Sequence, residues 1–119
     1  MTSTATCNPV TAYAKSKAVV DLEVSNMASD DFSPTFMRNA TAYGVSPRIR
    51  FDLVINNLVA WALTTGKILM KSDGTPWRPL VHIEDISHAV VCALKAPRDV
   101  THNLAVNVGS NTESYQMRD

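Results

Sequence analysis

The chain has 119 residues, which is enough for one domain with a single hydrophobic core. Apolar residues make up 45% of it and charged residues 18%, with only four glycines and six prolines, a composition that indicates a folded globular protein and excludes a disordered one. Eleven basic and eleven acidic residues cancel, and there is no Lys/Arg block, so the charge pattern of a nucleic-acid-binding protein is absent.

The cysteines and the apolar segments indicate the cellular setting. Cys7 and Cys92 give neither a metal-ligand spacing nor a disulfide framework, which favours a reducing compartment. Residues 1–6 lack the cationic start and apolar run of a secretory signal. No apolar segment approaches the length that spans a bilayer. We therefore expect a cytoplasmic protein without metal, membrane or nucleic-acid partners.

The first predicted element is a helix. Asn8 can cap it with its side-chain oxygen, and Pro9 fits the first helical position because its missing N–H would have no partner there. Helical periodicity continues to about Ala28. Tyr13 and Lys17 are four residues apart, so their side chains lie on one helix face, where an ammonium favours the phenolate and the pair could exchange protons. The alternative is an exposed pair without function.

A strand, a loop and a second helix follow. Residues 32–37 predict a short buried strand, with Pro34 restricted to its beginning. Residues 38–50 predict a loop that carries three arginines, and loops at strand ends commonly bind ligands. Residues 51–64 place apolar side chains on one broad stripe, which predicts a core-facing helix that ends at Gly66.

Further strands and a third helix come next. Two short strands are predicted at residues 67–70 and 79–83, separated by the turn-rich residues 72–76. Acidic residues from Glu84 onward suit the N-terminus of a helix, which Pro97 closes.

The last predicted strand covers residues 104–108, and Gly109 begins a polar tail. Helices alternate with short strands along the chain, without an internal repeat. This order predicts an α/β fold.

Five sequence blocks occur in one order along the chain. They are Pro9-x-Thr11-x-Tyr13-x-x-Ser16-Lys17, Arg38-Asn39-Ala40-Thr41-Ala42-Tyr43-Gly44, Asn56-Asn57-Leu58, Asp73-Gly74-x-x-x-Arg78-x-x-x-His82-x-x-Asp85 and Asn107-Val108-Gly109. The set resembles the extended short-chain dehydrogenases/reductases, specifically the NAD-dependent nucleotide-sugar epimerase/dehydratase family. The resemblance implies a partial Rossmann-like fold, one helix and one strand of the dinucleotide-binding sheet, plus a small α/β substrate domain. It implies a remnant of the NAD-binding domain in residues 1–50 and the substrate domain in residues 51–119.

The resemblance also implies roles for single residues. Tyr13 would be the catalytic acid/base and Lys17 would hold the nicotinamide ribose of NAD. A hydride would pass from a sugar carbon to NAD while a proton leaves the hydroxyl on that carbon, which gives a transient keto-sugar. Thr41 stands where many relatives have an asparagine near the nicotinamide. Asn57 matches a substrate-binding asparagine, and Arg78 matches an arginine that contacts the nucleotide diphosphate in relatives such as UDP-glucose 4-epimerase.

Several of these residues have structural alternatives. Arg78 could form a surface ion pair with Asp73 or Asp85, and Asn57 could be a helix-surface residue. We interpret His82 as a structural residue at a strand end and Asp85 as a helix cap.

Two family features have no counterpart in the sequence. The family begins with a glycine-rich turn that holds the cofactor pyrophosphate, and its catalytic serine or threonine lies well before the tyrosine. All four glycines here are isolated and follow Tyr13. We therefore expect the carboxy-terminal portion of such an enzyme, a truncated chain with weak NAD binding and weak or no independent activity. The alternative is a non-catalytic module that binds a nucleotide sugar or oligomerises, as a homo-oligomer or with a missing amino-terminal half.

Overall fold

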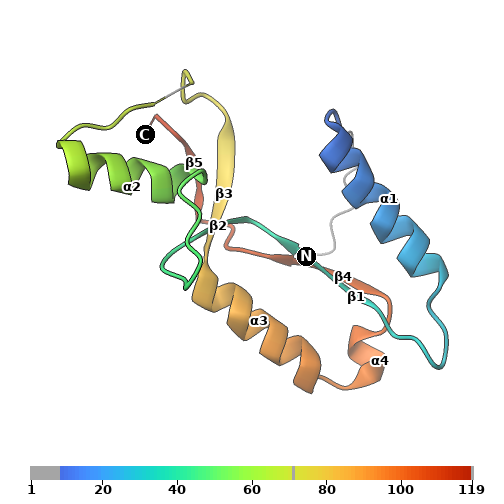
Figure 1. Cartoon of the computed structure of the whole chain (residues 1–119). Helices are drawn as coiled ribbons and strands as arrows, with labels where there is room; N and C mark the ends of the chain where they lie inside the picture. Colours follow the sequence, from blue (N-terminus) through green and yellow to red (C-terminus); the bar gives the residue numbers. More distant parts are fainter. Residues whose placement is uncertain (1–8, 71, 119) are drawn as a thin grey trace. The chain divides into compact units, whose positions relative to one another are not determined.

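The computed structural model describes residues 9–70 and 72–118. The predicted cap at Asn8, the loop with Cys7 and residues 1–6 lie outside the described residues. The described elements are α1 (Ala12–Asn26), β1 (Thr35–Asn39), β2 (Thr41–Tyr43), α2 (Val54–Thr65), β3 (Trp77–His82), α3 (Ile83–Lys95), α4 (Arg98–Thr101), β4 (Leu104–Val108) and β5 (Ser114–Gln116) (Figure 1). The predicted α/β class is confirmed.

The chain forms two compact units, each built from two chain segments. The first unit contains the described residues up to Arg38 together with Val91–Asn107. The second unit contains Asn39–Val90 and the described residues from Val108 onward. The assignment of residues 1–50 to cofactor binding and of 51–119 to substrate binding concerns function and stays a prediction.

In the first unit, α1 begins at Ala12 and ends at Asn26. Its N-cap is Thr11, whose extended backbone lets the hydroxyl accept the N–H of Ala14 at 3.1 Å. The predicted helix is thus correct, but Pro9 precedes it and does not occupy its first position. None of the residues of α1 is buried, and the apolar side chains of Val19 and Leu22 remain exposed.

The strands β1 and β4 form a two-stranded sheet. Before them the N–H of Asn103 donates to the C=O of Pro34 at 2.8 Å, and after them the N–H of Ala40 donates to the C=O of Val108 at 2.9 Å, so both strands run in the same direction. β1 begins only after Pro34, which has no N–H for the ladder, and so lies later than the predicted strand at 32–37. The predicted strand at residues 104–108 is confirmed.

Polar contacts connect α1 to this sheet within the first unit. Arg38 of β1 forms a salt bridge with Asp21 of α1 at 3.0 Å. The hydroxyl of Ser25 donates to the side-chain oxygen of Asn103, just before β4, at 2.9 Å. These contacts attach the C-terminal half of α1 to the sheet.

The second unit contains a three-stranded sheet in the order β2-β3-β5. β2 is parallel to β3, with Thr41 opposite Leu80, and β5 is antiparallel to β3. The predictions of a loop over residues 38–50 and of a polar tail after Gly109 are wrong where β2 and β5 form. Besides Pro34, the buried apolar side chains of the described residues are Leu80, Val81 and Val108.

The helix α2 lies within the second unit and confirms the predicted helix, although it begins at Val54. None of its residues is buried, so the prediction that it faces a core is wrong. Gly66 ends it in the left-handed conformation, with φ 68°, and donates its N–H to the C=O of Ala62. The predicted strand at residues 67–70 is wrong, because no ladder forms there and the N–H of Lys67 binds the hydroxyl of Thr65.

The remaining helices follow β3. The prediction of a strand at residues 79–83 is confirmed by β3, which begins earlier, at Trp77. The predicted helix closed by Pro97 is confirmed by α3, and the short α4 behind it was not predicted. Over residues 9–70 and 72–118, no helix has the length and apolar character to cross a membrane.

Candidate functional site

The predicted pair Tyr13 and Lys17 lies in the first turns of α1. Lys17 Nζ is 5.4 Å from the centroid of the Tyr13 ring, so the prediction that both side chains lie on one face is confirmed. The Tyr13 side chain is 73% exposed and therefore open to a ligand. The pair brings a phenol that can donate or accept a proton next to a positive charge.

Ser16, which belongs to the same sequence block, has a different task. Its hydroxyl donates to the C=O of Tyr13 at 2.8 Å. This bond runs back along the helix and satisfies a backbone carbonyl. The Ser16 hydroxyl is thus occupied by a backbone bond, whereas Tyr13 of the same sequence block is exposed to solvent.

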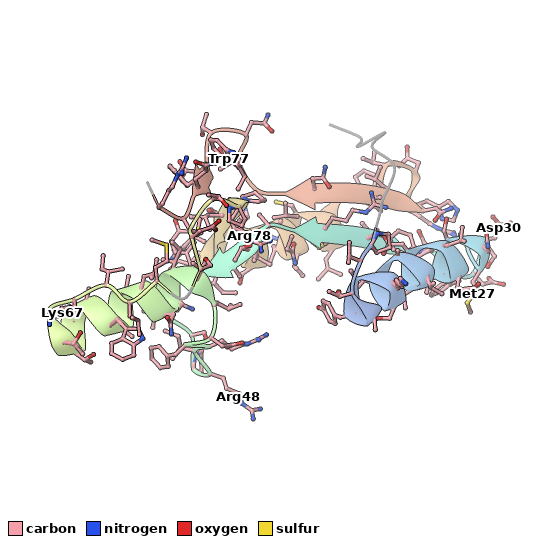
Figure 2. The ribbon with its side chains drawn as sticks, turned by 90° about the horizontal axis from the view of Figure 1, so that it is seen from above. Met27, Asp30, Arg48, Lys67, Trp77 and Arg78 are labelled. Carbon is pink, nitrogen blue, oxygen red and sulfur yellow. The ribbon has the colours of Figure 1, made fainter. Side chains whose placement is uncertain are left out.

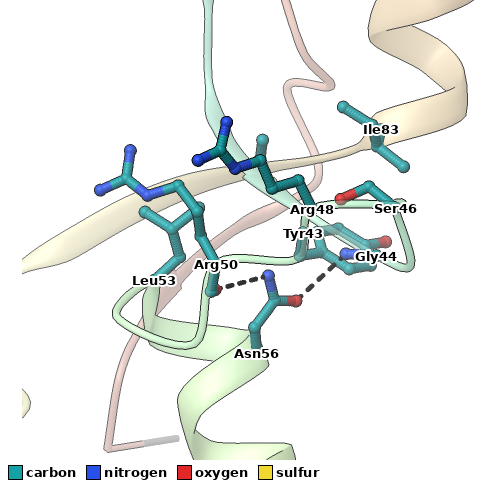
Figure 3. Close-up of a pocket in the computed structure, with 9 residues that line it drawn as sticks. Tyr43, Gly44, Ser46, Arg48, Arg50, Leu53, Asn56 and Ile83 are labelled. Carbon is teal, nitrogen blue, oxygen red and sulfur yellow. Dashed lines mark hydrogen bonds between the residues drawn. The ribbon is translucent and has the colours of Figure 1, made fainter.

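The second unit contains a pocket of about 290 Å³ next to the loop between β2 and α2 (Figure 3). We name residues 44–53 the arginine loop and the hollow beside it the arginine pocket. The polar side chains that line the pocket are Tyr43, Ser46, Arg48, Arg50 and Asn56. Ala42, Leu53 and Ile83 supply apolar walls.

Two arginines give the pocket its charge. Figure 3 shows their guanidinium groups on the same side of the pocket, and Figure 2 shows Arg48 extending away from the ribbon. Arg50 Nε donates to Asp52 Oδ1 at 3.0 Å, and this hydrogen bond holds the pKa of the Asp52 carboxyl below its ordinary value. No described residue forms a salt bridge with Arg48. A guanidinium beside a polar hollow suits a phosphate or carboxylate ligand.

Two adjacent asparagines of α2 hold the arginine loop. Asn56 accepts the N–H of Gly44 through Oδ1 at 3.2 Å and donates from Nδ2 to the C=O of Arg50 at 3.1 Å (Figure 3). Asn57 donates from Nδ2 to the C=O of Phe51 at 2.8 Å. The loop is therefore fixed to a helix by side-chain bonds near both of its ends.

Asn57 was predicted to bind substrate, and the structure places it in a different pocket. This second pocket of about 200 Å³ is largely apolar and is lined by Leu58, Leu69, Met70 and Ser72 in addition to Asn57. Asn57 is half-buried, and the alternative of a helix-surface residue without a binding role stays open. Since Nδ2 already binds the backbone, its Oδ1 is the atom that a ligand could use.

Arg78 and Thr41 lie in the same sheet, outside the lining of the arginine pocket. Arg78 is exposed on β3, opposite Tyr115 of β5. It forms no salt bridge with Asp73 or Asp85, so the alternative of a surface ion pair is wrong. The half-buried Thr41 begins β2. The structure thus brings Tyr13 and Lys17 together but does not collect the other predicted site residues in one pocket.

The predicted cap at Asp85 needs correction. His82, at the end of β3, accepts the N–H of Glu84 through Nδ1 at 3.3 Å, while Asp85 lies inside the first turn of α3 without a capping bond. The His82 ring also packs edge-on against Tyr43, with centroids 5.3 Å apart. Histidine therefore satisfies the helix N-terminus that the acidic residue was expected to cap. Among the residues that the structure describes, no three His, Cys, Asp or Glu side chains gather as a metal site would require.

Sequence reasoning placed Asn56 in a family block and Arg48 in the predicted loop but gave neither residue a role. The available signal was the group of three arginines in residues 38–50, next to a strand end. That signal located the loop, but the bonds from Asn56 depend on how the loop returns to α2.

Comparison with known proteins places the fold. The family model described as "NAD dependent epimerase/dehydratase family" matches residues 1–109. The dTDP-glucose 4,6-dehydratase of Bacillus anthracis, solved in complex with NAD, is similar with a TM-score of 0.80 and 21% identity over 99% of this chain and 36% of that chain. DesIV, the dTDP-glucose 4,6-dehydratase of Streptomyces venezuelae with NAD bound, gives a TM-score of 0.77 and 22% identity over 97% of this chain and 34% of that one.

A third solved structure is TunA, an NAD-dependent NDP-hexosamine 5,6-dehydratase involved in tunicamycin biosynthesis, with a TM-score of 0.72 and 26% identity over 94% of this chain and 36% of that chain. The chain spans about a third of the length of these three proteins. No curated protein sequence matches it significantly. The likeness confirms the predicted partial Rossmann-like fold.

Proposed function

This chain belongs to the NAD-dependent epimerase/dehydratase family, and we propose that it acts on a nucleotide sugar by hydride and proton transfer at a sugar carbinol, through a keto-sugar. The observation that carries the proposal is the Tyr13–Lys17 pair, held 5.4 Å apart on an exposed helix face. The reaction is inferred from family membership, and the exposed Tyr13 hydroxyl is proposed as its proton acceptor.

Each member of the pair has its own role in the proposal. The Tyr13 oxygen takes the proton of the sugar hydroxyl and returns it when the keto-sugar is reduced again. Lys17, whose Nζ lies 5.4 Å from the centroid of the Tyr13 ring, holds the nicotinamide ribose beside the phenol. Because both residues lie on α1, their relative position depends on one helix and its Thr11 cap.

The residues present fit one end of NAD better than the other. When bound, NAD supplies the hydride acceptor. The exposed hydroxyl and ammonium of α1 suit the nicotinamide ribose, and Thr41 is the further residue proposed near this end. The sequence contains no glycine-rich turn for the pyrophosphate, since its glycines stand singly. We therefore expect the 119-residue chain by itself to bind NAD weakly and to turn over slowly or not at all.

The nucleotide sugar would be held by residues of the second unit. Arg78 is exposed and forms no salt bridge with any described residue, so its planar fork is open to a diphosphate. Asn57 retains Oδ1 for a substrate hydroxyl or amide. The arginine pocket adds a second cationic position.

The test uses the purified chain with NAD and UDP-glucose or dTDP-glucose. Calorimetry measures NAD binding, and mass spectrometry of the sugar products measures keto-sugar formation. We expect weak NAD binding and a slow keto-sugar signal that increases with NAD concentration. Tight, stoichiometric NAD binding would contradict the expected weakness, and keto-sugar formation that is unchanged in Tyr13→Phe would contradict the catalytic proposal.

A second candidate is a non-catalytic module that binds nucleotide sugars and associates through α1. The observation that favours it is the exposed apolar surface of a helix without buried residues. Sedimentation of the chain separates the two candidates in part. Concentration-dependent association without keto-sugar formation supports the non-catalytic module. A monomer that forms keto-sugar excludes this second candidate.

A further inference from the structure

We propose that Asn56 is a positioning residue that holds the arginine loop in the shape that binds the phosphates of the substrate. The inference rests on the proposed function, because it concerns how the anionic part of a nucleotide sugar is recognised. Asn56 does not itself touch the ligand in this proposal. It acts through Arg48, which lies between the two loop positions that Asn56 holds.

One side chain joins two distant points of the loop. Oδ1 of Asn56 accepts the N–H of Gly44, directly after β2, and Nδ2 donates to the C=O of Arg50 (Figure 3). The segment between these points therefore forms a loop closed on α2. Asn57 continues the attachment, because its backbone N–H binds the C=O of Leu53 at 2.8 Å and its side chain binds the C=O of Phe51.

The closed segment carries the residues that a phosphate would meet. Ser46 and Arg48 both line the arginine pocket. The guanidinium of Arg50 is engaged by Asp52, whereas no described residue forms a salt bridge with Arg48. Arg48 is thus the cation that a phosphate can pair with while the loop keeps its internal ion pair. A hydroxyl and a guanidinium in the lining of one pocket match the oxygens of a phosphate.

Both ends of the closed segment lie beside contacts that do not involve Asn56, so losing Asn56 should loosen only the part between them. Gly44 has φ +115°, and a Cβ there would lie 2.6 Å from Nε2 of His82, which shows how closely this end packs. The other end is attached to α2 by Asn57. Each bond of Asn56 is a neutral hydrogen bond of ordinary length. We therefore expect the loop to lose its shape while the helix and the sheet remain folded.

The experiment measures binding of UDP and of inorganic pyrophosphate to the chain by NMR titration. Asn56→Ala should weaken both by roughly 5- to 10-fold, the equivalent of one neutral hydrogen bond or slightly more. Thr64→Ala is the matched control, since Thr64 lies on the same helix and its hydroxyl donates to the C=O of Ala60, away from the loop. This variant should bind both probes as the unchanged chain does.

A double-mutant cycle separates positioning from a general structural role. If Asn56 acts through Arg48, Asn56→Ala should change UDP affinity by less than twofold in an Arg48→Ala background, because the effects of coupled residues do not add. Thermal unfolding of Asn56→Ala should differ little from that of Thr64→Ala. A fully additive cycle, or a loss of affinity that simply follows a lowered unfolding temperature, overturns the positioning role.

The outcomes also separate this inference from the proposed function. If the unchanged chain binds UDP and Asn56→Ala binds it equally well, the inference is wrong and the proposed function stands. If the unchanged chain binds neither UDP nor pyrophosphate at millimolar concentration, the nucleotide-sugar function and the inference that rests on it both fall. Faster hydrogen exchange at the Gly44 amide in Asn56→Ala, with UDP binding weakened, supports the inference.

Discussion

Lys17 Nζ lies over the ring of Tyr13, 5.4 Å from its centroid and one helical turn further along α1. The pair needs no second element to bring it together, since i and i+4 side chains of one helix lie on the same face. The two side chains therefore lie on the same face whenever α1 is folded. Only its chemistry depends on which ligand reaches that face.

The first prediction concerns the phenol. Tyr13→Phe should reduce any keto-sugar formation by about 10²- to 10⁴-fold, because the acid/base group is lost while the ring and the helix remain. Tyr115→Phe is the control, since the Tyr115 hydroxyl donates to the Glu113 carboxylate and should not affect turnover. Product analysis at saturating NAD measures both variants. Equal turnover in Tyr13→Phe and the unchanged chain would remove Tyr13 from the mechanism.

The second prediction concerns Asp52 in the arginine loop. Its pKa lies below 3.8, chiefly because the Arg50 side chain donates to the carboxylate. Because the pKa of Asp52 is lower in the folded chain than in the unfolded chain, its bond with Arg50 stabilises the fold at pH values above 3.8. This stabilisation is lost as the pH falls through the lowered pKa of the folded chain. Arg50→Gln should raise the pKa of Asp52 towards 3.8, as read from carboxyl NMR shifts. Arg48→Gln should leave it unchanged, and an equal shift in both variants would refute the assignment.

The third prediction concerns a tyrosine at the opposite end of the pH scale. The pKa of Tyr115 is raised above 10.0, first because its hydroxyl donates to Glu113 at 2.8 Å. The neutral phenol is thus favoured in the folded chain. The stability that its bond with Glu113 contributes is complete below pH 10.0 and is lost as the pH rises through the raised pKa of Tyr115. Glu113→Ala should lower this pKa towards 10.0 in a titration of ring NMR shifts. Glu84→Ala serves as the control acid and should have no effect.

The fourth prediction compares two glycines with positive φ. A Cβ on Gly66 would meet no atom within 4 Å, so Gly66→Ala should cost only the backbone strain, about 1 kcal/mol. A Cβ on Gly44 would lie 2.6 Å from the His82 ring, so Gly44→Ala adds overpacking and should cost roughly 2–4 kcal/mol. Urea unfolding measures both. Equal losses of unfolding free energy in the two variants would mean that the His82 ring moves away from the new Cβ without an energetic cost.

Local signals explain which parts of the fold the sequence could predict. The stripe of apolar residues before Gly66 predicted α2 and its end, because periodicity and a left-handed cap act within a few residues. The spacing of Tyr13 and Lys17 was sufficient for the same reason. The cap of α1, by contrast, was predicted at Asn8, whereas the helix begins later and Thr11 caps it.

The parts of the fold that the sequence could not predict depend on pairing between distant segments. β2 and β5 are three residues long, too short for alternation to be visible, and they exist because β3 offers an edge on each side. Residues 68–70 form a short apolar run like that of a buried strand but pair with no other strand, and Leu69 and Met70 line the pocket beside α2 instead. The arginine pocket was out of reach for the same reason, since Asn56 meets Gly44 only after the chain has turned back.

The discontinuity of both units has a consequence for biosynthesis. β1 pairs with β4, and α2, β3 and α3 all lie between them in the sequence. On the ribosome, the first unit therefore has to wait until nearly the whole chain has emerged before its sheet can close, and long-range pairing of this kind is slow. During that interval α1 has emerged with its apolar side chains uncovered, so it is open to chaperones and proteases.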